Sequence, residues 1–247
     1  MSAVVEVRAP AKLTLSLRIE GIRDDGYHLI DAEMVTLDFH DRLRIGPGDD
    51  LTVSGDVPAV DGDDLVTRAL GLVGRTAAVD VDKRIPAGAG LGGGSADAAA
   101  VLRWAGWTNL RAAGRLGADV PFCLVGGRAR VRGIGDVIEP MPLIGQVFTL
   151  STPEARCPTP AVYARWDDMG GPVGDNGNDL EPAALDLVPE LAVARDLLGE
   201  VSGQRPRLAG SGSTWFVEGA FPGEGRVVVH AAAVTGEALP VVLPRGR

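Results

Sequence analysis

Five glycines, at positions 88, 90, 92, 93 and 94, lie in the segment IPAGAGLGGGSADAAAVL, residues 85–102. Glycine lets successive backbone N–H groups converge on an anion, because no side chain intervenes and positive φ angles cost little. The alanine-rich run that follows predicts a helix, capped by Ser95 and ending at Trp104, whose positive amino-terminal end faces the loop. The segment therefore predicts a phosphate-binding loop, and the alternative is a tight turn into a buried helix.

Two other kinds of glycine-rich loop fit the segment less well. Gly88, Gly90 and Gly93 satisfy the G-x-G-x-x-G spacing of a dinucleotide site. Such a loop normally belongs to a strand-helix-strand unit with an acidic residue after the second strand. Here a second short helix, predicted over LRAAGRL, and the turn that carries Asp119 come next. A Walker A loop is excluded, because no Gly-Lys-Ser/Thr follows the glycines.

Strands must position this loop, and the first lies at the amino terminus. Pro10 interrupts it and cannot donate to a sheet ladder, so we expect a bulge, an edge or a break there. Lys12 and Thr14 share the polar face, and RDDGYH supplies a turn before a second strand region over residues 32–45, which predicts a hairpin or meander. The apolar residues alternate, which predicts one common face for Val5, Val7, Ala9, Ala11, Leu13, Leu15, Leu17 and Ile19.

The rest of the chain alternates between helical and strand patterns. A helix is predicted over DDLVTRALGLVGRTA, a strand over AVDVDKRI just before the glycines, and paired short strands over GRARVRGIGDVIEP. A strand is predicted over QVFTLST, one helix over DLVPELAVARDLLGEV, and a last strand over TWFV. DNGND, in the loop 170–179, does not fit a calcium site, so we expect its aspartates on a mobile surface segment.

Composition bounds the class of protein. The chain has 247 residues, 45% of them hydrophobic, which fits one or two packed domains; we expect domains over 1–145 and 146–247. Its 24 Lys and Arg against 33 Asp and Glu give a net charge of -9, which disfavours a nucleic-acid partner. Two cysteines and no long apolar run predict a cytoplasmic protein without a membrane partner. We further expect a monomer or a weak homodimer.

The glycine segment resembles the second motif of the kinases named for galactose, homoserine, mevalonate and phosphomevalonate, the GHMP kinases, whose loop wraps the phosphates of ATP. PAKLTLSLRI, DDGYH, LGADVPF, RGIGD, NDLE and LAGSGSTWFV match further motifs. Together they are similar to the branch of that family that phosphorylates 4-diphosphocytidyl-2-C-methyl-D-erythritol in the non-mevalonate isoprenoid pathway. The resemblance runs from about residue 8 to 218, and DGYH with LGADVPF is more specific than the glycine loop.

The resemblance implies an α+β fold with an amino-terminal domain like domain 2 of ribosomal protein S5 and a ferredoxin-like carboxy-terminal domain. It implies phosphorylation of the 2-hydroxyl of the cytidine-linked substrate by ATP with Mg²⁺, whose protein ligands stay unknown. Lys12 and Asp119 match the catalytic pair. The residues matching the ATP site are Pro86, Gly88, Gly90, Leu91, Gly92, Gly93, Gly94 and Ser95. Those matching the substrate site, with a cytosine held by Tyr27, His28 and an opposing Tyr163, are Thr14, Tyr27, His28, Thr159, Tyr163, Gly210 and Gly212.

Taken alone, these residues have plainer interpretations. A strand lysine is usually solvated, an aspartate after Gly-Ala usually lies on a turn, and Tyr27 with His28 would form a hairpin tip. The chain also departs from the family, which commonly has Asn at position 14 and a second Ser at Ala96, and residues 107–116 form a short connection. Two alternatives therefore stay open: another small-alcohol kinase of the family, and a nucleotide-binding homologue that has lost catalysis.

Overall fold

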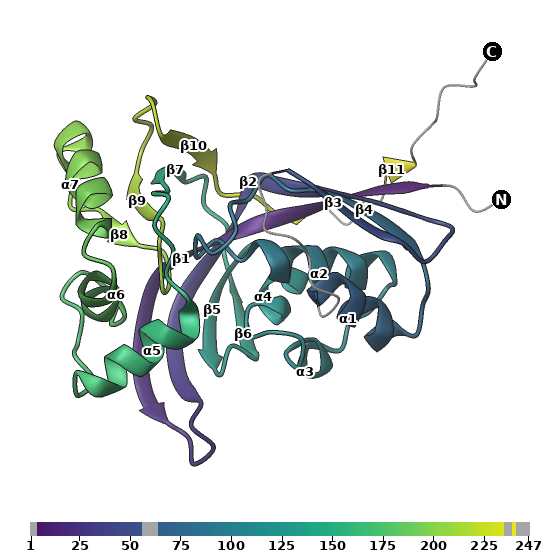
Figure 1. Cartoon of the computed structure of the whole chain (residues 1–247), viewed down its shortest axis with the longest axis horizontal. Coiled ribbons are helices and arrows are strands. Elements are labelled where there is room, and N and C mark those ends of the chain that lie inside the picture. The colour runs from purple at the N-terminus through teal and green to yellow at the C-terminus, as the bar shows by residue number, and fades with distance from the viewer. Residues whose placement is uncertain (1–3, 56–63, 235–238, 241–247) are drawn as a thin grey trace.

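The computed structural model describes residues 4–55, 64–234 and 239–240, which form a seven-stranded and a four-stranded sheet (Figure 1). The strands are β1 (Val5–Ile22), β2 (His28–Gly46), β3 (Leu51–Ser54), β4 (Ala78–Asp82), β5 (Arg128–Gly133), β6 (Val137–Met141), β7 (Val147–Ser151), β8 (Arg207–Leu208), β9 (Trp215–Glu218), β10 (Arg226–His230) and β11 (Leu239–Pro240). The helices are α1 (Leu65–Val73), α2 (Gly93–Trp104), α3 (Leu110–Ala113), α4 (Val120–Val125), α5 (Thr159–Asp168), α6 (Glu181–Leu187) and α7 (Leu191–Ser202).

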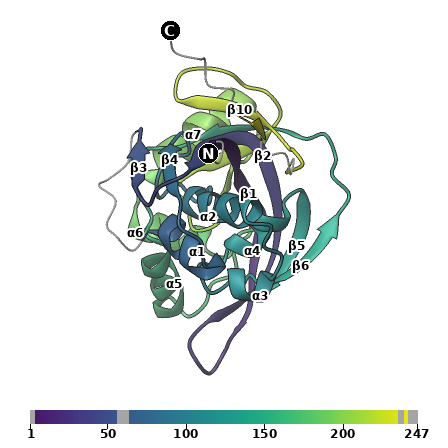
Figure 2. The same cartoon turned by 90° about the vertical axis from the view of Figure 1, so that its right-hand side faces the viewer.

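A long antiparallel hairpin of β1 and β2 forms the centre of the larger sheet. The turn around RDDGYH closes this hairpin, as the sequence predicts. One edge of β2 pairs with β4 near the strand's end and with β5 near its start, β3 runs parallel to β4, and β11 pairs with β1. Helices α1 to α4 lie against one face of this sheet, with α2 packed on β1 (Figure 2). The predicted helix end at Trp104 and the predicted pairing of β5 with β6 are confirmed.

Two bulges decide which side chains of β1 face the helices. The register between β1 and β2 shifts between Pro10 and Lys12 and again between Thr14 and Ser16. At the first shift residues 37–39 of β2 lie opposite Ala11, and at the second Leu15 is an unpaired residue of β1; the side chains of β1 change faces at both places. The prediction of one common apolar face is therefore wrong, and that of an irregularity at Pro10 is confirmed. Val7, Ala9 and Leu17 join the main core with α2, whereas the residues between the bulges join a second core with β7 and β9; these are Ala11, Leu13 and Leu15.

The smaller sheet has the order β10-β7-β9-β8 and is antiparallel throughout. Helix α7 packs against β7 and β9. The single helix predicted over residues 186–201 is wrong, because α6 ends at Leu187 and α7 starts at Leu191. Pro189 lies in the break, where it cannot donate a helical hydrogen bond. The sequence also gave no indication of α4 and α5, which carry part of the site described below.

The larger sheet draws its strands from residues 5–141 and 239–240, and the smaller sheet from residues 147–230. The boundary near residue 145 stays a prediction. None of the helices in the described ranges is both long and apolar enough to cross a lipid bilayer.

Candidate active site

A cavity of about 1160 Å³ gathers the side chains and loops that the sequence analysis singled out. Two of them, Leu91 and Gly212, do not line it. Those that do are Lys12, Thr14, Tyr27, His28, Pro86, Gly88, Gly90, Gly92, Gly93, Gly94, Ser95, Asp119, Thr159, Tyr163 and Gly210. Residues that are far apart in the sequence thus share one cavity, although their individual roles stay predictions.

The glycine loop joins β4 to α2, as predicted, but Ser95 does not cap the helix. Helix α2 begins at Gly93, and its N-cap is Gly92, with φ of 70° in the left-handed region and no capping side chain. Glycine adopts this conformation readily because it has no Cβ. The first N–H groups of an α-helix have no intrahelical acceptor. Those of Gly93 to Ser95 thus begin a helix whose end lies at the cavity, an arrangement that suits an anion.

The glycine-rich segment at 210–213 packs directly beside the glycine loop. A Cβ at Gly90 would lie 2.4 Å from the carbonyl oxygen of Ala209 and 2.7 Å from that of Gly212, so only glycine fits there. The N–H of Thr214 donates to the carbonyl of Ala89 at 3.2 Å. Gly212 therefore lies behind the loop. Leu91 is buried in the second core.

Lys12 lies between the two bulges of β1, where the reversed register turns it toward the α2 side of the sheet. Its backbone N–H donates to the carbonyl of Leu91 at 3.0 Å, which ties the strand to the glycine loop. Its Nζ donates to Oγ1 of Thr14 at 3.0 Å and lies 3.3 Å from Oδ2 of Asp119. Lys12 is only 5% exposed, so its charge needs these partners.

Asp119 precedes α4, where an aspartate normally caps the helix. Its side chain makes no capping hydrogen bond. The carboxylate is instead paired with the Lys12 ammonium and is 31% exposed in the cavity. A buried ammonium beside a partly exposed carboxylate is an arrangement that can accept a proton from a hydroxyl group and stabilise the negative charge that develops.

A buried ion network under the loop escaped the sequence analysis. Lys83 pairs with Asp41 and, at 2.6 Å, with Asp97 of α2. Asp41 also accepts from the backbone N–H of Ile85 at 2.8 Å, so it holds the start of the loop. Burial raises the pKa of Asp97 to about 7, against the opposing effect of the Lys83 charge. The one sequence signal for this network was an isolated carboxylate within an alanine-rich helix.

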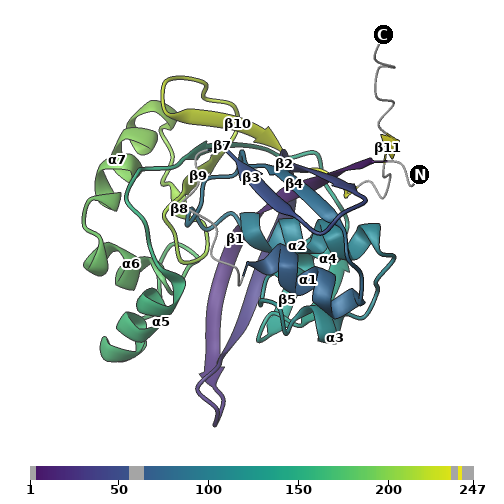
Figure 3. The same ribbon diagram turned by 45° about the vertical axis from the view of Figure 1, so that its right-hand side comes forward.

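The side chains predicted for the base lie at the hairpin tip and on α5, which runs beside the hairpin (Figure 3). The rings of His28 and Tyr163 have centroids 4.7 Å apart and are tilted by 44°. Burial, followed by the charge of Asp119, raises the pKa of Tyr163, so its hydroxyl stays protonated. Tyr27 is 59% exposed. Its predicted stacking role stays a prediction, as does the role of Thr159, whose Oγ1 lies 2.8 Å from Oγ of Ser211.

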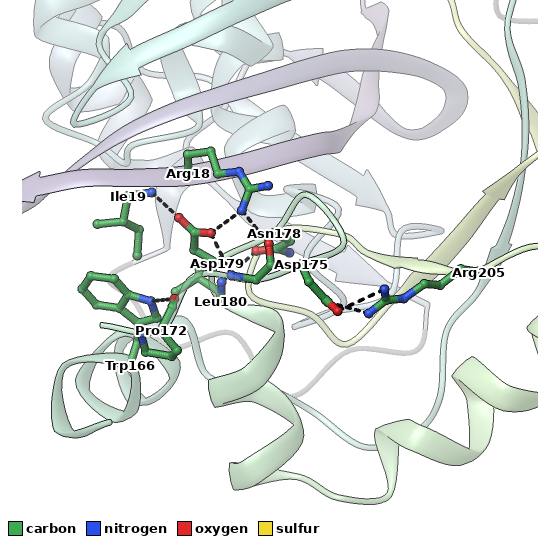
Figure 4. A network of polar contacts seen from close by, with 10 residues as sticks. Arg18, Ile19, Trp166, Pro172, Asp175, Asn178, Asp179, Leu180 and Arg205 are labelled. Atoms are coloured by element: carbon green, nitrogen blue, oxygen red, sulfur yellow. Dashed lines mark hydrogen bonds and ion pairs between the residues drawn. The ribbon is translucent and has the colours of Figure 1, made fainter. Parts of the chain in front are cut away.

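The NDLE motif braces the site, so the prediction of surface aspartates is wrong for Asp179. Its carboxylate accepts from Arg18 at 2.6 Å and from the backbone N–H of Ile19 at 2.9 Å (Figure 4). Asn178 donates to the carbonyl oxygens of Leu208 and Gly210. Both side chains are buried because they satisfy the backbone groups of segments that meet there. Asp175 in the same loop is exposed, as predicted.

The glycine loop and α2 lie in a domain of the GHMP kinase class: residues 64–127 match the family model for the N-terminal domain of GHMP kinases. A 4-diphosphocytidyl-2-C-methyl-D-erythritol kinase from Paracoccus denitrificans is 38% identical, with 92% of this chain and 91% of the relative covered. A kinase of the same name from Ruegeria pomeroyi is 36% identical, with 95% of this chain and 94% of the relative covered. The chain belongs to the 4-diphosphocytidyl-2-C-methyl-D-erythritol kinase family.

Solved structures agree with this assignment. A crystal structure of a 4-(cytidine 5'-diphospho)-2C-methyl-D-erythritol kinase superposes with a TM-score of 0.73 at 31% identity, covering 92% of this chain and all of that one. A homoserine kinase from Cytophaga hutchinsonii superposes with a TM-score of 0.61 at 17% identity, which supports the fold alone. The predicted α+β GHMP kinase fold is thus confirmed.

Proposed function

We propose that the chain transfers the γ-phosphoryl group of ATP to the 2-hydroxyl of 4-diphosphocytidyl-2-C-methyl-D-erythritol. The observation that carries this proposal is the Lys12–Asp119 pair, whose Nζ and Oδ2 atoms are 3.3 Å apart. The pair lies in one cavity with the glycine loop and His28. Phosphoryl transfer needs positioning and electrostatic stabilisation more than covalent help. The family relationship supplies the substrate class.

In this mechanism the loop and the amino-terminal end of α2 hold the ATP phosphates. Asp119 accepts the proton of the substrate hydroxyl, and Lys12 stabilises the negative charge that is redistributed as the phosphoryl group moves. Thr14 stands where the family commonly has Asn, and its hydroxyl accepts a hydrogen bond from Lys12. It therefore orients the catalytic cation. Ala96, the other departure, is fully buried, so a substitution there bears on packing.

Mg²⁺ is the metal that the family implies, and the donor set of the cavity fits it. Ser95, Asp97 and Asp119 line the cavity, and Oδ1 of Asp97 is buried without a hydrogen-bond partner in the described part of the chain. The described residues offer no cluster of three or more His, Cys, Asp or Glu. Both facts suit an ion that keeps several waters and is held largely by ATP phosphates. When bound, Mg²⁺ would neutralise charge on the transferred phosphoryl group.

The deciding experiment measures ATP consumption with four acceptors: the cytidine-linked methylerythritol, homoserine, mevalonate and galactose. We expect turnover with the first alone. Turnover with only one of the other three would assign the chain to another small-alcohol kinase. Binding of ATP and of the cytidine compound without turnover would support a homologue that has lost catalysis.

A further inference from the structure

His28 is held from three sides by residues of α5. Its Nε2 lies 2.8 Å from Oδ1 of Asp167. The Tyr163 ring is tilted against it, and the Trp166 ring meets it edge-on with centroids 5.6 Å apart. Trp166 is itself fixed, because its Nε1 donates to the carbonyl of Pro172 at 2.9 Å (Figure 4). The imidazole at the hairpin tip therefore has a set orientation, determined by a helix about 140 residues further along the chain.

The contact with Asp167 also decides which ring nitrogen carries the proton. A neutral imidazole has one N–H donor and one lone-pair acceptor, and an ionised carboxylate only accepts. The hydrogen bond to Asp167 therefore favours the tautomer with its proton on Nε2. Nδ1 is then an acceptor, and it has no hydrogen-bond partner in the described ranges. His28 and Asp167 both line the cavity, so the base has access to this histidine.

We propose that Asp167 is a positioning residue that makes the base pocket select cytosine over uracil. By holding the proton on Nε2, it leaves the Nδ1 lone pair to accept from the exocyclic amino group of cytosine. Uracil has a carbonyl oxygen at the same position, so it would place an acceptor against an acceptor. This inference rests on the proposed function, since it assumes that His28 contacts the base of the cytidine-linked substrate.

A purely structural role for the pair is the competing explanation. Asp167 could serve only to attach the hairpin tip to α5. The Asp167 side chain is 42% exposed, however, and a single hydrogen bond to a partly solvated carboxylate contributes only modestly to stability. The aromatic contacts of Tyr163 and Trp166 already join the tip to the helix. The tautomer of His28 controls selectivity between bases, whereas a simple attachment of the hairpin tip to α5 would not affect it.

The test compares Asp167→Asn with Asp168→Asn, an identical change at the next position, whose exposed side chain does not line the cavity. Binding of cytidine 5'-diphosphate and of uridine 5'-diphosphate is measured by calorimetry, with the ATP site saturated by a non-hydrolysable ATP analogue. We expect Asp167→Asn to reduce the cytidine-to-uridine affinity ratio by about tenfold, the equivalent of one net hydrogen bond. An amide both donates and accepts, so it satisfies either tautomer. Asp168→Asn should keep the wild-type ratio, and Asp167→Glu should restore part of it.

The tautomer is also observable without any ligand. The chain has three histidines, so the ¹⁵N signals of His28 can be assigned by comparison with His28→Gln. We expect the Nε2–H form in the wild type and a mixture in Asp167→Asn. An Nδ1–H form in the wild type would overturn the proposal, as would an equal loss of both nucleotides in Asp167→Asn. Neither readout requires turnover, so a failure of the proposed kinase activity would be recognised separately.

Discussion

Asp119→Asn removes the proposed proton acceptor while preserving the shape of the side chain. At 3.3 Å, the pair with Lys12 has a gross Coulomb energy of roughly 5 kcal/mol at an effective dielectric constant near 20, before the cost of desolvation. That attraction keeps the Asp119 carboxylate beside the Lys12 ammonium in the cavity. Its loss, with the loss of the base itself, should lower turnover by about 10²- to 10⁴-fold, or about 2.7 to 5.5 kcal/mol. Both substrates should still bind.

Lys12→Met should act in the same direction, because it removes the cation that stabilises charge in the transition state. Since both residues serve one event, the double variant should be little worse than the poorer single variant. Turnover is measured by ADP release, with equilibrium binding of each substrate measured in parallel. The exposed Asp168→Asn variant is the control and should keep wild-type turnover. Losses that multiply in the double variant would refute the shared role, and unchanged turnover in both single variants would refute the catalytic assignment.

Three further predictions concern the loop, the base pocket and the buried network. Gly92→Val should raise the KM for ATP and lower turnover, because φ is 70° and a Cβ would lie 2.9 Å from Cγ of Lys12. Steady-state kinetics measure this effect, with Gly74→Val as the control because Gly74 has a similar φ and lies outside the cavity. Unchanged ATP kinetics in a folded Gly92→Val protein would show that the loop is only a structural turn. Tyr163→Ala should weaken binding of the cytidine substrate by about 1 to 3 kcal/mol and leave ATP binding unchanged, with both affinities measured by calorimetry. An equal loss of affinity for the two ligands would show that Tyr163 does not belong to the base pocket. Burial raises the pKa of Asp97 in the folded state, so its contribution to the free energy of unfolding should fall as pH rises from about 3.9 to about 7. In urea unfolding, the stability of Asp97→Asn should therefore depend less on pH than that of the wild type. The same pH dependence in both proteins would contradict the raised pKa.

Local patterns predicted much of the fold. Alternation identified the hairpin, and the strand-glycine-helix order located the loop. Pro10 signalled an irregularity, but alternation could not reveal that the strand changes faces there or that a second shift follows Thr14, because an apolar residue at every second position looks the same in either case. This reversal is what places Lys12 on the α2 side, so the decisive feature of the site depends on pairing between strands.

Some residues of the candidate site could be predicted from local motifs, and others could not. The glycines and Asp119 belong to contiguous motifs, so their common cavity followed from the family resemblance. Asp41 and Asp167 gave no local signal: one alternates within an ordinary strand pattern, and the other lies on a helix that was not predicted. Their roles arise from contacts with Lys83 and His28, which are tens of residues or more away in sequence.

The two register shifts that flank Lys12 also bear on how chain length can change in this family. A single insertion or deletion between them would move Lys12 to the opposite face, away from the loop and Asp119. The alignment with the Paracoccus denitrificans relative spans 251 positions, more than the 247 residues of this chain, so that relative has residues without a counterpart here. Such differences are tolerated in connections like the one at 105–109, where no strand register depends on the count. Because the position of Lys12 depends on the pairing register, we expect changes in chain length to be tolerated less well within the hairpin than in such connections.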